Sequence, residues 1–265
     1  MASSNKIAFH ARSISLPTKS NPLTLTVEEQ LCRLRSSELA ISSSSISHNL
    51  AGLKDLYESV DDLLQLPLTQ DEKCLNVVLD GNLMLLDVCG TSRDVLSQMK
   101  QCVQDLQSSI RRRRGGDVDL ENEISTYMTS RKKVSKVIRK CLTDLKRMDN
   151  KNTEVSVLRE VETTTLAVLE SLLSFVSGPK QSSWSLVSKL MPTKRVAPKG
   201  EEETTEVMKV DILLKALISH KPSKSDMQKP LEALQMSLQD LEDGLESVFR
   251  CLIKHRVSLL NILNQ

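Results

Sequence analysis

Aromatic side chains are scarce in this sequence: one Trp, two Tyr and three Phe make up 2% of its 265 residues. Strands are rich in aromatic and β-branched residues, so a β-sandwich or β-barrel is excluded. Glycine and proline number eight each, too few for a fold that turns about every ten residues. Leu, Ser, Lys, Glu and Gln dominate instead, and most of these favour helices. Composition therefore predicts an all-α fold.

Long apolar runs are also missing. A membrane-spanning helix needs about 18 consecutive apolar residues, and the best candidate, residues 74–90, is interrupted by Asp80, Gly81 and Asp87. The first residues lack the apolar segment of a secretory signal peptide. They are free of acidic residues and rich in serine, which also fits a transit peptide. We expect a cytoplasmic protein, with a plastid or peripheral membrane location as the alternatives.

Cysteine pairs are absent as well. The six cysteines stand singly, without a CxxC pair or a neighbouring histidine. Such spacing indicates reduced thiols in an intracellular protein and argues against a structural zinc site. The residues concerned are Cys32, Cys74, Cys89, Cys102, Cys141 and Cys251.

Catalytic signatures are missing too. The four histidines are isolated, and the chain contains no HExxH, no P-loop and no GxGxxG motif. Paired acids such as Asp61–Asp62 and Glu201–Glu203 are interpreted as solvated faces or a first helical turn. We expect a protein that is not an enzyme and binds no cofactor, with an enzyme of unrecognised type as an unfavoured alternative.

Apolar residues recur at steps of three and four over most of the chain, as in helices packed on one face. The pattern predicts an elongated bundle of about five or six helices over residues 26–265, preceded by a disordered basic tail over residues 1–25. Residues 179–204 form an irregular excursion. The expected helices cover residues 26–64, 70–113, 119–148, 153–177, 205–219 and 230 to near the end.

Local signals set the ends of these helices. Thr26 and Glu29 form a capping-box pattern at the start of the first helix. The serine run 42–45 weakens this helix without ending it, and Pro67 ends it. Gly178 closes the helix 153–177 as a C-cap. The short connection through residues 115–116 predicts antiparallel packing of the helices 70–113 and 119–148.

The last helix carries the most regular apolar seam, and only a histidine interrupts it. Such a seam fits a bundle core or a coiled coil between chains, and we favour the bundle core. Its members are Leu231, Leu234, Leu238, Leu241, Leu245, Val248, Leu252, His255, Leu259 and Ile262.

Basic residues gather between positions 100 and 147, although the formal net charge is only +2. Four arginines follow one another at the end of the helix 70–113, where the helix dipole favours cations. In the next helix, four cations share one face. A solvated face explains this pattern; the alternatives are an acidic protein partner or an anionic membrane surface. Nucleic acid is disfavoured because stacking aromatics are nearly absent. The candidate interaction face comprises Arg111, Arg112, Arg113, Arg114, Lys132, Lys136, Arg139 and Lys140.

The tail contains the hexapeptide RSISLP at residues 12–17. Arg12 precedes Ser15 by three residues, the spacing that basophilic kinases recognise. With Pro17, the segment resembles the 14-3-3 ligand pattern R-S-x-phosphoserine-x-P, in which arginines of the partner hold the phosphate. We therefore predict a phosphorylation-gated docking segment formed by Arg12, Ser15 and Pro17. The alternative is a tail that is never modified.

Four stretches resemble the BYPASS-related family of plant proteins of unknown function: FHARSISLP at 9–17, LLQLP at 63–67, RRRRGG at 111–116 and LEDGLESVFRCLIKHRVSLLNIL at 241–263. The resemblance implies a mostly helical land-plant protein with a role in root and shoot development, and plastid or membrane association in some members. It carries over no catalytic or ligand residue. We expect a non-enzymatic regulatory or scaffold protein that binds other proteins. The alternative is a peripheral membrane module.

Overall fold

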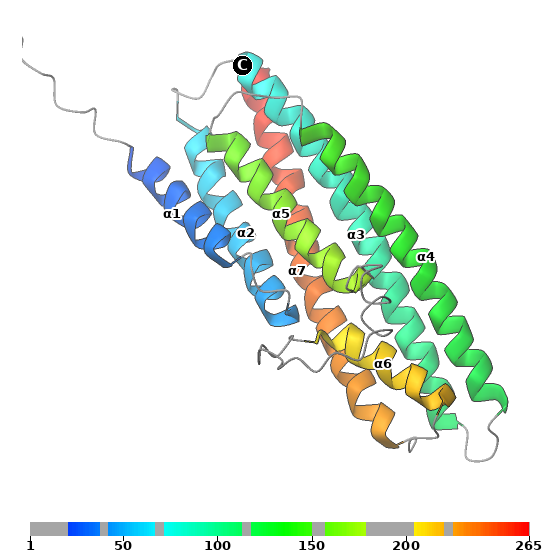
Figure 1. Cartoon of the computed structure of the whole chain (residues 1–265). Coiled ribbons are helices and arrows are strands. Elements are labelled where there is room, and N and C mark those ends of the chain that lie inside the picture. Colours follow the sequence, from blue (N-terminus) through cyan, green and yellow to red (C-terminus); the bar gives the residue numbers. More distant parts are fainter. Residues whose placement is uncertain are drawn as a thin grey trace, which may run out of the picture.

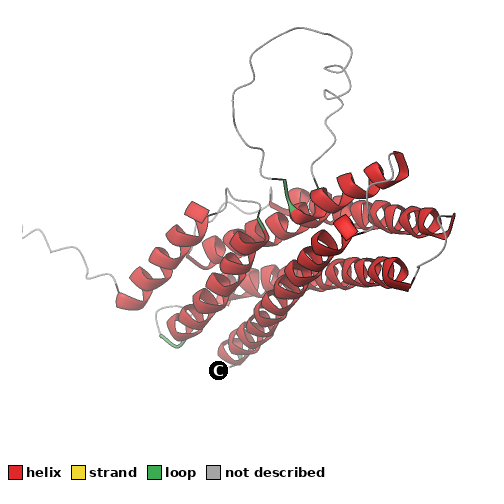
Figure 2. Ribbon diagram, turned by 90° about the horizontal axis from the view of Figure 1, so that it is seen from below, coloured by secondary structure: helices red, strands yellow, loops and turns green. Residues whose placement is uncertain are grey.

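Every regular element in the described part of the chain is an α-helix (Figures 1 and 2). A computed structural model describes residues 21–37, 42–66, 72–112, 118–149, 157–178, 204–219 and 225–264. The predicted all-α, elongated bundle is confirmed. The seven helices in these ranges are α1 (Pro22–Ser37), α2 (Ser43–Leu64), α3 (Glu72–Arg112), α4 (Val118–Asp149), α5 (Val157–Ser177), α6 (Glu206–Ser219) and α7 (Ser225–Leu263).

Four of the helices form a ring in the order α2, α5, α3, α7, with each helix packed on its two neighbours. The other three lie outside this ring. α1 packs on α2 and α5, α4 packs on α3 and α5, and α6 packs on α7. α3 and α4 run side by side in opposite directions, as predicted (Figure 1).

The predicted first helix is two helices, and it begins four residues before the expected start. The side chain of Asn21 accepts a hydrogen bond from the Leu23 amide at 2.9 Å, and Pro22 occupies the first helical position. The hydroxyl of Thr26 donates to the Pro22 carbonyl inside the helix. The capping-box prediction at Thr26 and Glu29 is therefore wrong, because a stronger start signal precedes it.

The serine run starts a helix, contrary to the prediction that one helix continues through it. Ser42 has extended backbone angles and accepts a hydrogen bond from the Ser45 amide at 3.2 Å, which makes Ser42 the N-cap of α2. Serine competes with the helical backbone for hydrogen bonds and is favoured at this position. α2 ends at Leu64, before Pro67 as expected.

Two further helix ends bear on the predictions. Gly178 has a φ of 76°, the left-handed conformation that glycine adopts at a C-cap, so the predicted end of α5 is confirmed. α7 begins at Ser225 and contains Pro230 in its second turn, five residues after the start. The predicted start at Pro230 was late, because a proline near a helix start removes only one backbone hydrogen bond.

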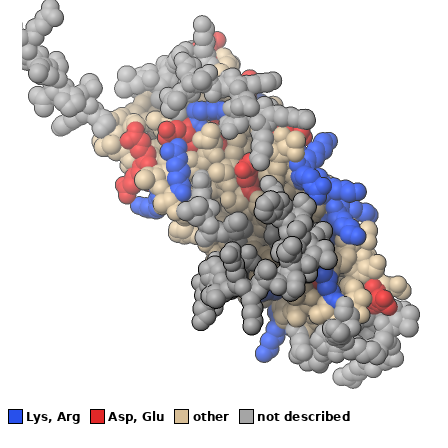
Figure 3. All heavy atoms as spheres, in the orientation of Figure 1, with Lys and Arg blue, Asp and Glu red and all other residues tan. Residues whose placement is uncertain are grey.

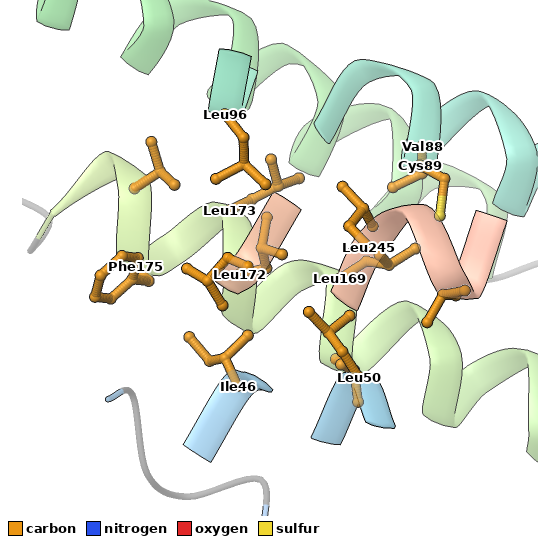
Figure 4. Packing of buried hydrophobic residues seen from close by; sticks show 14 of the residues in the cluster. Ile46, Leu50, Val88, Cys89, Leu96, Leu169, Leu172, Leu173, Phe175 and Leu245 are labelled. Carbon is orange, nitrogen blue, oxygen red and sulfur yellow. The ribbon is translucent and has the colours of Figure 1, made fainter. Parts of the chain in front are cut away.

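The seam of α7 forms the centre of the bundle, so the bundle-core interpretation is confirmed. Its leucines and Val248 are fully buried, and Ile262 is partly buried. Figure 4 shows Leu50, Cys89, Leu169 and Leu245 converging, one from each helix of the ring. Fully burying one such leucine contributes about 1.5–3 kcal/mol.

Candidate interaction face and buried polar cluster

The side of α4 that faces away from the bundle carries a basic face. Lys132, Lys136, Arg139 and Lys140 are exposed, together with Lys133, and none of them takes part in an ion pair between described residues. Figure 3 shows lysine and arginine side chains gathered along the edge where α4 lies. We call these five residues the α4 basic face. Cations without partners keep their full attraction for an external anion.

The arginines at the end of α3 do not extend this face. Arg111 is exposed and pairs with Glu232 of α7 at 3.2 Å, and Arg112 donates to the Ser108 carbonyl of its own helix. Lys132 lies fourteen residues into α4, roughly 20 Å along its axis from the α3–α4 connection. Arg113 and Arg114 lie outside the described residues.

Arg131 belongs to the same run of basic residues but is buried. Its guanidinium donates to the Val176 and Ser177 carbonyls at the end of α5, and its Nη2 lies 2.9 Å from Asp211 of α6. Tyr127 donates to the same carboxylate at 3.2 Å. One side chain thus satisfies carbonyls that a helix end leaves without partners and joins α4, α5 and α6.

A second polar cluster joins α2 and α7, with His255 and Tyr57 buried inside the four-helix ring and Lys254 exposed. The Nδ1 of His255 in α7 lies 3.2 Å from one carboxylate oxygen of Asp61 in α2, and Nζ of Lys254 lies 3.1 Å from the other. The Tyr57 ring packs edge-on against His255, with the ring centres 5.4 Å apart. The Tyr57 hydroxyl donates to Thr165, whose own hydroxyl donates to a carbonyl of α5.

The cluster corrects the interpretation of Asp61 as a solvated acid, since its side chain is buried and only Asp62 is exposed. Burial raises the pKa of Asp61, but the hydrogen bonds from His255 and Lys254 outweigh burial, so the pKa lies below its usual range. Burial also raises the pKa of Tyr57, which therefore remains a protonated donor. The single polar residue of the apolar seam is thus paired across the core.

A small cavity of about 10 Å³ lies beside His255. Such a volume is close to the space that one water molecule needs. Its lining includes two buried acceptors: Oδ1 of Asn82, and Oε1 of Glu162, which lies 2.7 Å from Arg159; neither accepts an aligned hydrogen bond within the described residues. Gly81 allows the approach of Glu162, because a Cβ there would lie 2.5 Å from the carboxyl group.

Three of the described thiols are poor nucleophiles. Burial raises the pKa of the Cys89 thiol to about 12 and also raises the pKa of Cys141 and Cys251, which keeps these thiols protonated and weakly nucleophilic. Cys32, Cys89, Cys102, Cys141 and Cys251 are free. In the described ranges, no three His, Cys, Asp or Glu side chains are grouped as metal ligands, and no helix has the length and apolar character to cross a membrane.

The docking segment of Arg12, Ser15 and Pro17 lies outside the described residues, so the geometry bears only on the other sites. Two features were not predicted from the sequence: the burial of Arg131 and the pairing of His255 with Asp61. Arg131 follows Tyr127 by four residues and precedes Val134 by three, which places it on the buried stripe of α4. His255 interrupts the seam and so required a buried polar partner.

Comparison with protein families gives one match. The family model described as Protein BPS1 matches residues 49–262, which is more than three quarters of the chain. The chain belongs to the BPS1 family. Its membership confirms the resemblance to BYPASS-related plant proteins and supports a plant protein related to development. The match covers α2 to α7 almost completely, including the polar cluster and the α4 basic face. The search of curated proteins and the search of solved structures gave no match.

Proposed function

We propose that this BPS1-family chain is a non-enzymatic scaffold in plant development that acts by binding acidic proteins in the cytoplasm. The observation that carries the proposal is the α4 basic face: five exposed cations within nine residues, without an ion pair among the described residues. They lie on a long helix that the ring of α2, α3, α5 and α7 supports through α3 and α5. A rigid charged surface favours fast and salt-sensitive association with acidic partners.

Charge reversal on α4 tests the proposal. A variant carrying Lys132→Glu, Lys136→Glu, Arg139→Glu and Lys140→Glu is compared with wild type by proximity labelling in root tissue. Because the cations make no ion pair within the described residues, the fold is expected to remain. We expect acidic partners to disappear from the labelled set. The same partners labelled by both chains would contradict the proposal.

A matched control separates local charge from net charge. Arg33→Glu, Lys54→Glu, Lys209→Glu and Lys229→Glu change the net charge equally, on α1, α2, α6 and α7. All four residues are exposed. We expect this control to label the wild-type set of partners. Loss of partners in both variants would assign the effect to net charge and not to α4.

The same observation favours a second candidate, a peripheral membrane module that uses the α4 basic face. Each lysine or arginine near an anionic membrane surface contributes about 1 kcal/mol of attraction. Flotation with neutral and with phosphatidylserine-containing vesicles tests this candidate. Binding to the anionic vesicles alone, lost at high salt and in the α4 variant, supports it. Wild-type protein that stays in the soluble fraction at low salt removes it.

We further propose that the tail adds a phosphorylation-gated contact. Arg12 positions a basophilic kinase, Ser15 receives the phosphate, and Pro17 directs the chain out of a 14-3-3 groove. A peptide of residues 1–25 phosphorylated at Ser15 is expected to bind 14-3-3, and the Ser15→Ala peptide is expected not to bind. Equal binding of both peptides, or a mature protein from plant tissue that begins after Pro17, would contradict this part of the proposal.

A further inference from the structure

The outer edge of the junction between α3 and α7 changes character along its length. Over the first part of α7, cations of α3 face acids of α7 across the edge, as in the polar rim of a packed helix pair. Three ion pairs cross it: Arg111–Glu232, Lys100–Glu242 and Arg93–Glu246. The Arg93 guanidinium also lies over the Phe249 ring, 4.9 Å from its centre. Ion pairs therefore cover this part of the edge.

The described ion pairs stop at Glu246, and the same rows of side chains then become apolar. On α7, Ile253 and Leu260 follow Glu246 at seven-residue spacing. On α3, Leu86 precedes Arg93 by seven residues. Residues seven apart lie nearly above one another on a helix. These apolar residues therefore lie on the same side of each helix as the charged residues of the ion pairs.

Four apolar side chains are exposed at this end of the junction: Leu83 by 47%, Ile253 by 44%, Val257 by 51% and Leu260 by 38%. We call them the α3–α7 stripe. α3 otherwise packs on α4 and α5, and α7 packs on α2 and on α6, which lies beside the first part of α7 (Figure 1). Figure 2 shows the C-terminal part of α7 at the edge of the bundle. A contiguous exposed apolar patch indicates a contact surface.

The stripe has acids on one flank and bases on the other. Asp80 and Asp87 are exposed on α3 and make no ion pair within the described residues. Arg250 and Lys254 are 76% and 69% exposed on α7, where Arg250 pairs with Glu246 of its own helix and Lys254 pairs with Asp61 of α2, each at 3.1 Å. Such exposed ion pairs contribute little free energy, so the two cations can exchange partners. The α3 flank carries two acids about two turns apart, and the α7 flank carries two bases about one turn apart.

Two hydrogen bonds fix the levels of these charges. Asn82 donates to the Leu252 carbonyl at 3.3 Å, and Arg256 donates to the Leu79 carbonyl at 3.1 Å. α3 and α7 are antiparallel (Figure 1). Asp80 therefore lies at the level of Lys254. At the same rise per residue, Asp87 lies at the level of Ser247, three residues or about 4.5 Å along the axis from Arg250.

We propose that the α3–α7 stripe joins two copies of the chain about a twofold axis parallel to the helices. Such an axis lays α3 of each copy on α7 of the other without changing the level of any residue. Asp80 then lies at the level of Lys254 of the second copy, and Asp87 lies within one helical turn of Arg250, a distance that the long arginine side chain can span. Each pair occurs twice by symmetry, around a shared apolar centre.

The charges also select this axis over the other face-to-face arrangement. A twofold axis perpendicular to the helices lays α3 on α3, which brings acids against acids and bases against bases. Like charges in contact across an interface cost free energy. The occupant that the charge pattern fits is therefore a second copy in the parallel arrangement. This surface is separate from the α4 basic face, and its test is independent of partner binding.

Light scattering and sedimentation of the purified full chain over micromolar concentrations test the proposal. We expect a concentration-dependent dimer. Ile253→Glu with Val257→Glu is expected to weaken it at least about tenfold, because charges then enter the apolar centre. Met236→Glu is the control, since Met236 is 68% exposed on α7 but lies outside the stripe. A monomer at every concentration, or a dimer that survives the paired change, would overturn the proposal.

A charge swap separates the stripe from an unrelated apolar contact. Asp87→Arg and Arg250→Glu are each expected to weaken the dimer, and the two together in one chain are expected to restore it, because the swapped charges meet across the axis. Melting temperatures close to wild type show that each variant is folded. A double variant as weak as the singles would overturn the proposed arrangement.

Discussion

α7 and α4 are both long amphipathic helices, but they occupy different environments. α7 packs on α2, α3 and α6, and its seam is aliphatic except for one histidine. α4 packs mainly on α3 and α5 and reaches α6 through Tyr127 and Arg131, and its outward-facing side is exposed and basic. The extent of packing against neighbouring helices thus separates a helix that stabilises the bundle from a helix that presents charge.

Each helix also contains one residue of the kind that is typical of the other helix. His255 is a polar residue in the seam of α7, and it is paired with Asp61. Arg131 is a cation on the buried stripe of α4, and it is paired with Asp211. A buried polar group costs little when it is hydrogen-bonded and much when it is not. The effect of a substitution is therefore set by burial and pairing, not by residue type.

The largest expected effect is at the centre of the α7 seam. Leu245 is fully buried, so Leu245→Asp places a charge in a packed core and is expected to cost several kcal/mol of unfolding free energy. Urea denaturation followed by circular dichroism measures it. Met236→Asp, on the exposed side of the same helix, is expected to stay within about 0.5 kcal/mol. Similar losses in both variants would remove the distinction between the two faces of α7.

The next effect concerns the pair formed by His255 and Asp61. His255→Leu and Asp61→Leu are each expected to cost about 1–3 kcal/mol, since each leaves a buried polar partner unpaired. The double variant is expected to be closer to wild type than the sum of the singles, because two apolar side chains replace the pair. Additive losses would show that the two residues act separately.

A comparable but smaller effect is expected at Arg131, which tests whether this residue of α4 behaves like a core residue. Arg131→Met leaves two carbonyls without this donor and leaves Asp211 with Tyr127 as its donor, and is expected to cost about 1–2 kcal/mol. Hydrogen exchange is expected to increase in α6 and at the end of α5. Lys132→Met, one residue along and exposed, is the control and is expected to change neither stability nor exchange.

The smallest effect is the pH dependence that Asp61 produces. The pKa of Asp61 is lower in the folded chain than in the unfolded chain. Its stabilising contribution is therefore complete above the unfolded pKa, about 4, and is lost as the pH falls below that value through the folded pKa. Stability measured between pH 5 and pH 3 is expected to fall less steeply in Asp61→Asn than in wild type. Parallel curves would contradict the assigned pKa direction.

Periodicity predicted the helices and the seam because burial repeats with the turn of a helix. It could not show that Asp61 is buried, because Asp61 follows Val60 at the edge of the α2 stripe and its partner lies 194 positions away. The same limit applies to the Arg131–Asp211 pair. Local signals competed at the start of α1, where Asn21 and Pro22 outweigh Thr26 and Glu29. The exposed basic face was predictable because an exposed cation, unlike a buried one, needs no partner from a distant part of the sequence.

The long sequence separation between α2 and α7 has a consequence for biosynthesis. α2 and α3 pack on a helix that begins at Ser225, about 160 residues after α2 ends. At 5–20 residues per second, roughly 10–30 seconds separate the emergence of α2 from that of its partner. During this interval the apolar faces of α2 and α3 lack the surface that covers them in the finished bundle. Chains interrupted before α7 are therefore substrates for chaperones and proteases.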